Sequence, residues 1–241
     1  MNTFANLAYE FNRTFIVDNR WKFFTKGLGN TLTITVFALL LGLTIGIIVA
    51  AVRSSYDKNK DSMRPGAGRT ILKIANAICN VYLTVIRGTP VVVQLLIMYF
   101  IILASVRNGV IVACITFGIN SGAYVAEIIR GGIMAIDNGQ FEAGRSLGFN
   151  YLQTMRYIVI PQTIKAVLPA LANEFIALLK ETSIAGYVAI MDITKAGDIV
   201  RGITYAAFFP LIGVALIYLV LVMFFTRMVG KLEKRLRRDA H

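Results

Sequence analysis

Residues 27–52 read GLGNTLTITVFALLLGLTIGIIVAAV, a run without a single charged side chain. A helix needs about 20 predominantly apolar residues to cross the hydrocarbon core of a bilayer. Three further charge-free runs occupy 88–106, 108–126 and 202–226. The four runs predict transmembrane helices, and the fold class that they indicate is an all-α integral membrane protein.

The composition of the whole chain agrees with a membrane location. Of its 241 residues, 56% are hydrophobic and 16% are charged, whereas a soluble domain has about 45–50% apolar and about 25% charged residues. A fifth apolar run, 157–179, is interrupted by Lys165 and Glu174. We therefore expect about five transmembrane helices. Their expected positions are roughly 27–52, one span within 71–105, about 109–134, about 157–180 and about 205–227.

The net charge of +12 is concentrated in two short segments. Residues 53–73 and 227–241 each hold six basic side chains. Short basic segments beside apolar spans lie on the cytoplasmic side by the positive-inside rule, so the charge indicates membrane topology and not nucleic-acid binding. Five spans with both basic segments inside place the N-terminus outside and the C-terminus in the cytoplasm, and they leave the 135–156 loop in the cytoplasm.

The sequence divides into three parts by its charge and aromatic pattern. The first part interleaves aromatic and basic residues, which is typical of an amphipathic helix lying at the membrane surface. Within the apolar part, Gly88-Thr89-Pro90 is expected to bend or interrupt the second span. The expected parts are an N-terminal interfacial helix in 1–26, a transmembrane domain in 27–230 that includes a loop at 138–161, and a basic cytoplasmic tail in 231–241.

Residue types for catalysis or metal binding are scarce in this chain. Cys79 and Cys114 are isolated in apolar surroundings, and the single histidine is His241. Neither a disulfide framework nor a metal site is expected from this pattern. No G-x-x-x-x-G-K-[ST] sequence, which would cradle ATP phosphates, occurs. We expect no catalytic residue, no metal and no cofactor in this chain.

A polar island separates the third and fourth spans. It reads EAGRSLG from Glu142 to Gly148 and, after nine residues, IVIP from Ile158 to Pro161. Residues 140–147 favour a helix, Gly148 favours its end, and Pro161 is expected to reset the chain before the fourth span. The island is either a docking element or an ordinary loop between two helices.

The spacing of this island resembles the EAA loop of ABC-importer permeases, the cytoplasmic element that docks onto an ATPase subunit. Gly144 stands where that loop usually has its second alanine, and it keeps the residue small. The resemblance extends in the right order to polar amino-acid permeases, the histidine/glutamine/arginine branch of type I ABC importers. The segments that carry it are Val85–Pro90, Gln94-Leu95, Tyr124–Ile133 and Leu179–Ser183, with Glu181 where aspartate is common.

This resemblance implies a transport subunit of the bacterial inner membrane that works by alternating access. Its implied partners are ABC ATPase subunits that bind ATP and Mg²⁺, a second copy or homologue of the permease, an extracytoplasmic amino-acid-binding protein, and membrane lipid. The alternative is a stand-alone secondary carrier or channel, which would often contain inverted repeats; none is found. The implied ATPase-coupling residues are Glu142, Ala143, Gly144, Arg145, Gly148 and Pro161.

Polar side chains inside the spans are candidates for substrate binding, because ionisable groups are costly there. The resemblance implies polar amino acids as substrates, and carboxylates within the spans, which would suit a cationic side chain or an ammonium group, extend this expectation to basic ones. The alternatives are structural ion pairs or anchors for Glu127, Arg130, Lys180 and Glu181, and hydrogen bonds between helices for the uncharged groups. The candidate residues are Asn120, Ser121, Tyr124, Glu127, Asn173 and Glu174.

Overall fold

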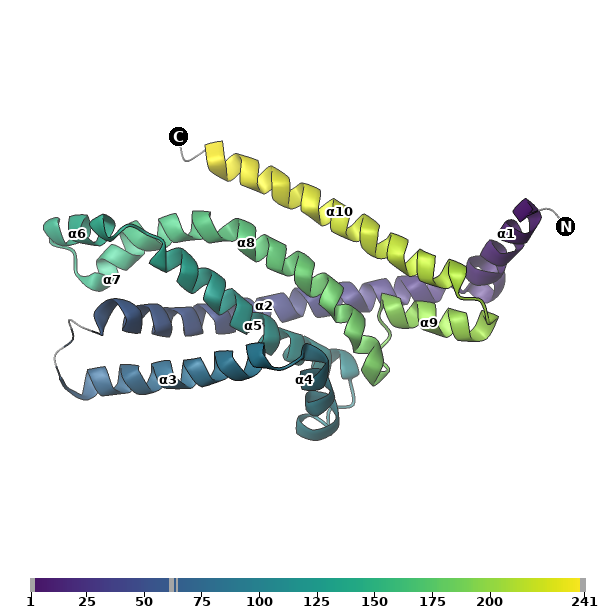
Figure 1. The fold of residues 1–241 in the computed structure, drawn as a ribbon, viewed down its shortest axis with the longest axis horizontal. Coiled ribbons are helices and arrows are strands. Elements are labelled where there is room, and N and C mark those ends of the chain that lie inside the picture. The colour runs from purple at the N-terminus through teal and green to yellow at the C-terminus, as the bar shows by residue number, and fades with distance from the viewer. Residues whose placement is uncertain (1–2, 61–62, 64, 239–241) are drawn as a thin grey trace. The chain divides into compact units, whose positions relative to one another are not determined.

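The computed structural model describes residues 3–60, 63 and 65–238, and in this part of the chain the secondary structure is helical with no strand (Figure 1). Within these described residues, five helices are long and apolar enough to cross a membrane, which confirms the predicted all-α membrane fold. The candidate spans are Trp21–Asn59, Ala67–Gly88, Gly109–Met134, Tyr151–Val188 and Phe208–Arg235. The end of the basic tail, 239–241, lies outside the described residues.

The α-helices follow the predicted order along the chain, with additional short helices between them. Their bounds are α1 Thr3–Phe11, α2 Trp21–Asn59, α3 Ala67–Gly88, α4 Val91–Ile97, α5 Gly109–Met134, α6 Asn138–Ser146, α7 Tyr151–Thr154, α8 Ile160–Glu181, α9 Ile193–Thr204 and α10 Phe208–Arg238.

The expected interruption of the second span at Gly88-Thr89-Pro90 is confirmed: the segment 71–105 holds two helices, because Thr89 adopts an extended conformation (φ −122°, ψ 144°) before Pro90, as residues that precede proline prefer. Two features differ from the predictions. The connection between the fourth and fifth spans contains α9, which the sequence analysis did not anticipate. The fourth span starts at Tyr151, so the expectation that Pro161 resets the chain is wrong.

A π-helical turn explains how the helix passes Pro161. This turn spans Met155–Val159 and joins α7 to α8, and the N–H of Ile160 donates to the carbonyl of Met155, five residues back. Proline lacks an N–H and its ring clashes with the carbonyl four residues earlier. The wider turn relieves this crowding, and the chain remains helical.

The chain divides into two compact units, each assembled from separate segments. The first unit comprises Met1–Ala38, Val91–Phe117 and Ile176–Met228, and the second unit comprises Leu39–Pro90, Gly118–Phe175 and Val229–His241. The polar residues with substrate-binding or coupling predictions all fall in the second unit.

The first unit has its apolar core around α9. Phe24, Ile193, Val200 and Val214 are buried together there. Asp192 caps α9: its carboxylate accepts hydrogen bonds from the N–H groups of the next helical turn, at 2.9 Å. Such caps satisfy donors that have no partner within a helix.

The second unit packs α2, α3 and α5 closely. Val49, Leu83, Ala123 and Ala126 form its core. A Cβ atom placed on Gly46 would lie 2.7 Å from Cβ of Val125, so glycine is required where α2 approaches α5. Small residues at contacts between membrane helices permit this close approach.

Candidate functional site

The predicted docking element is the helix α6, which begins and ends as the sequence suggests. Asp137 caps it by accepting a hydrogen bond from the N–H of Gly139 at 2.6 Å. Gly148 follows the helix with φ at 78°, a left-handed conformation that glycine adopts at little cost. The expected helix end at Gly148 is therefore confirmed.

The exposed face of α6 carries charge. Glu142, Ala143 and Arg145 are exposed, as close docking against a partner requires. Gly144 is buried instead, and a Cβ atom there would lie 2.6 Å from Oγ1 of Thr154. The small residue at 144 thus serves the packing of α6 on α7, and it does not lie on the exposed face. Pro161 is exposed on α8.

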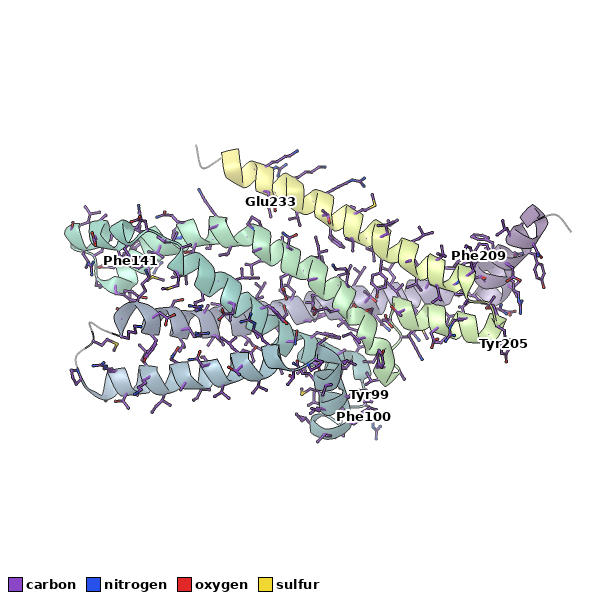
Figure 2. All side chains as sticks on the ribbon, in the orientation of Figure 1. Tyr99, Phe100, Phe141, Tyr205, Phe209 and Glu233 are labelled. Carbon is purple, nitrogen blue, oxygen red and sulfur yellow. The ribbon has the colours of Figure 1, made fainter. Side chains whose placement is uncertain are left out.

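Two contacts fasten the start of α6 to the end of α2. Nζ of Lys58 donates a hydrogen bond to Oδ1 of Asn138 at 2.8 Å. The same ammonium lies 4.5 Å from the ring centroid of Phe141, a cation–π arrangement; Figure 2 labels Phe141 on α6. The start of α6 is therefore in direct contact with the second unit's part of α2.

The remainder of the loop is also ordered by local contacts. Asn150 and Gln153 form a reciprocal capping box at the start of α7, with both hydrogen bonds at 2.9 Å. The rings of Phe149 and Tyr157 lie 6.0 Å apart. Such a capping box satisfies two N–H groups at the start of a helix, so the loop presents α6 on a defined support.

The predicted substrate-binding residues separate into two groups within the second unit. In the first group, Oγ of Ser121 on α5 donates to Oε1 of Glu174 on α8 at 2.8 Å. Ser121 is buried and Glu174 is partly buried. Asn120 precedes this serine and is 3% exposed, whereas Asn173 is exposed on α8.

The second group is centred on Glu127 of α5. Its carboxylate lies 2.9 Å from Arg53, 3.4 Å from Arg130 and 3.8 Å from Arg87. Arg130 also pairs with Asp57 at 3.1 Å. We call Arg53, Asp57, Arg87, Glu127 and Arg130 the arginine cluster. The cluster supports the structural alternative for Glu127, since three guanidinium groups already compensate its charge.

Tyr124 connects this cluster to an exposed surface. The guanidinium of Arg87 lies 5.8 Å from the Tyr124 ring centroid. Tyr124 is 39% exposed, although the residues on either side of it along α5 are buried. The predicted residue Tyr124 is thus an exposed side chain between buried neighbours on this helix.

Sequence reasoning anticipated Arg130 as an ion-pair partner of Glu127 but missed the other two, Arg53 and Arg87. Arg53 lies directly after the first charge-free run, and its charge was attributed to topology alone. Arg87 directly precedes Gly88-Thr89-Pro90, and this part of the sequence was interpreted as a bend, without a role for the arginine. The available signal was the cost of a carboxylate inside a span, which requires a cation on a neighbouring helix.

Outside the spans, two carboxyl groups of the first unit have pKa values that differ from the usual ones. Burial raises the pKa of the Asp192 carboxyl, although its hydrogen bonds at the start of α9 oppose the shift. Hydrogen bonds from Arg201 and Lys195 lower the pKa of Asp198. Asp198 forms an ion pair with each, on one exposed face of α9. Asp198 is therefore a charged group of the exposed surface, held by its two neighbours on α9.

The described part of the chain thus combines five helices long and apolar enough to span a membrane with an exposed, charged helix in the loop between two of them. Residues 66–238 match the family of binding-protein-dependent transport system inner membrane components. The chain belongs to this family, which makes it a multi-pass protein of the bacterial inner membrane and implies an ATPase and a binding protein as partners. A permease subunit of this kind is not itself catalytic, and the alternative of a stand-alone carrier does not fit the family.

Individual relatives agree with this assignment. The chain is 37% identical over 217 residues to a putative glutamine transport system permease protein GlnP from Rickettsia bellii, covering 89% of this chain and 93% of the relative. It is 36% identical over 220 residues to the arginine transport system permease protein ArtQ of Bacillus subtilis, covering 90% of this chain and 94% of that relative.

Solved structures show the same fold. A crystal structure of an amino acid ABC transporter with histidines superposes with a TM-score of 0.78 at 36% identity, covering 98% of this chain and 99% of that chain. The MetNI methionine ABC transporter in an inward-facing conformation gives a TM-score of 0.75 at 18% identity, covering 90% of this chain and 97% of that chain. The latter similarity concerns the fold alone.

Proposed function

We propose that this chain is the transmembrane subunit of an ATP-driven importer of polar amino acids. The observation that carries the proposal is α6, a capped and exposed charged helix in the loop between two spans of a binding-protein-dependent transport component. Relatives named for glutamine and arginine transport support amino acids as the substrate class. A second copy or a homologue of the chain would complete the transport pathway.

Coupling would pass through α6. Glu142 and Arg145 on its exposed face would pair with charged groups of an ATPase subunit, and Ala143 between them would let the two surfaces approach. Lys58 and Thr154 hold α6 against the rest of the second unit. Movement of the ATPase subunits would therefore displace the second unit as α6 moves.

The substrate would be recognised at least in part by the Ser121–Glu174 pair. A partly buried carboxylate with one hydrogen bond retains capacity to accept from an ammonium or guanidinium group. This geometry supports a role for Glu174 in binding a cationic group, and it supports Glu174 over Glu127, whose charge the arginine cluster already compensates.

The test of the proposed function is reconstitution of this chain in proteoliposomes with its ATPase and binding protein. We expect uptake of glutamine or arginine that requires ATP. Glu142→Lys reverses the charge at the docking face, so it should abolish both co-purification of the ATPase and uptake. The control is Glu233→Lys, the same substitution on α10 away from the loop, which should retain both activities.

Two results would contradict the proposal. Uptake by the wild-type chain without the ATPase would indicate a self-sufficient carrier. Normal co-purification and uptake in Glu142→Lys would show that α6 does not couple the two subunits.

A further inference from the structure

The arginine cluster contains more positive than negative charge. Three arginines, Arg53, Arg87 and Arg130, face two carboxylates, Asp57 and Glu127. In addition, Nε of Arg53 and Nε of Arg130 are buried without a hydrogen-bond partner among the described residues. The cluster therefore has one positive charge in excess and more hydrogen-bond donors than acceptors. It could accommodate one anion, which would neutralise that charge.

Arg87 is the least engaged of the three arginines. Its guanidinium lies 3.8 Å from Glu127, whereas Arg53 lies 2.9 Å from the same carboxylate and Arg130 has two carboxylate partners. The side chain of Arg87 is 46% exposed, compared with 18% for Arg53 and 27% for Arg130. The excess charge is thus most accessible at Arg87.

The position of Arg87 indicates what its exposed side faces. It lies in the last turn of α3, a candidate span, and it is held over the ring of the exposed Tyr124. Charged side chains within spans rarely face lipid; they face a water-filled cavity or other protein, or, near a helix end, reach the membrane surface. The guanidinium of Arg87 is directed instead at Glu127 and Tyr124 of the neighbouring helix α5. Arg87 and Tyr124 therefore belong to a surface that is shielded from lipid, as the lining of a transport pathway is.

We propose that Arg87 binds the α-carboxylate of the transported amino acid. A planar guanidinium pairs with a carboxylate through two parallel hydrogen bonds, and the excess charge of the arginine cluster means that such an anion would not need a counter-ion. Every amino acid has this carboxylate, so Arg87 recognises the backbone of the substrate whatever its side chain. The proposal rests on the proposed function and adds to it a residue in the second unit that the sequence pattern marked only as a bend.

The test measures ligand preference and not only transport. The permease–ATPase complex is reconstituted in nanodiscs, and binding of radiolabelled glutamine and arginine is competed with each amino acid and with its α-carboxamide, which lacks the carboxylate. Loss of a hydrogen-bonded charge pair typically weakens binding about tenfold or more. We expect the wild-type complex to prefer the amino acid over its carboxamide by about that factor, and Arg87→Gln to lose the preference.

Two further variants separate recognition from folding. Arg87→Lys retains the charge but not the paired hydrogen bonds, so its preference should be intermediate. Lys73→Gln removes an exposed cation from the same helix and should bind as the wild-type complex does. The proposal would be overturned if Arg87→Gln still preferred the amino acid over its carboxamide. It would also be overturned if Arg87→Gln lost the permease–permease assembly, because Arg87 would then pair with the second copy.

The outcome for the wild-type complex distinguishes this proposal from the function on which it depends. If ATP-dependent uptake of amino acids occurs and Arg87→Gln discriminates against the carboxamide as before, only the role of Arg87 is wrong. If neither glutamine nor arginine is bound or taken up by the wild-type system, the substrate class itself is wrong.

Discussion

At the scale of single residues, the two predicted carboxylates differ in their surroundings. Glu127 is paired with arginines from three helices, whereas Glu174 accepts one hydrogen bond from the described residues, that of Ser121. An ion pair that is already formed contributes to holding helices together, and its removal leaves a cation uncompensated. Glu127 therefore has a structural role in this arrangement, and Glu174 remains the carboxylate that a cationic substrate can use.

The substitution Glu174→Gln tests the role of this carboxylate. The substitution removes the negative charge but retains an acceptor for Ser121, so we expect uptake of arginine, lysine or histidine to fall by about tenfold relative to that of glutamine. Uptake of both classes in proteoliposomes measures this ratio, and basal ATPase activity should persist because α6 is unchanged. Equal losses for cationic and neutral substrates would show that Glu174 is structural.

At the scale of elements, the loop around α6 depends on one close contact. A Cβ atom on Gly144 would lie 2.6 Å from Oγ1 and 2.8 Å from Cγ2 of Thr154. Threonine carries both atoms on its branched Cβ, so rotation about χ1 replaces one obstructing atom by another. The contact can be relieved only if α6 moves or if residue 154 becomes smaller.

This contact predicts a compensating pair of substitutions. Gly144→Ala should displace α6 and weaken co-purification of the ATPase, although alanine is usual at this position of the EAA motif. Thr154→Ala in the same chain should restore it, because the obstructing atoms are gone. A double-mutant cycle on ATPase affinity measures the coupling; additive effects of the two substitutions would mean that the contact does not position α6.

At the scale of the whole molecule, the five spans and the two basic segments predict the topology. With the N-terminus outside and the C-terminus in the cytoplasm, a cysteine at Lys60 should react only from the cytoplasmic side and one at Tyr205, which is 94% exposed, only from the outside. Cys79 and Cys114 are first replaced by alanine to give a cysteine-free background. Labelling of position 60 from outside would refute this topology.

Features that depend on residues close together in the sequence could be predicted, whereas contacts between distant residues could not. Charge-free runs such as 27–52 and local signals such as Gly148 act within one segment, so the five spans and the end of α6 followed directly. The arginine cluster joins Arg53, Arg87 and Glu127 from three helices, and no local pattern specifies such pairing. α9 was missed although its signal was present: after the capping Asp192, its buried residues Ile193, Ala196, Gly197 and Val200 recur at the helical spacing of three and four. The predictions rested on apolar runs long enough to span a membrane, and α9 is too short and too polar to be one.

The π-helical turn at Met155–Val159 has a consequence for the length of the chain. In an α-helix, one inserted or deleted residue rotates everything beyond it by about 100°. The wide turn already holds one residue more than α-helical hydrogen bonding requires. Within the fourth span, homologous chains can therefore gain or lose one residue at 155–159 while Glu174 still faces Ser121. We expect a sequence alignment of relatives to place a one-residue gap in this turn.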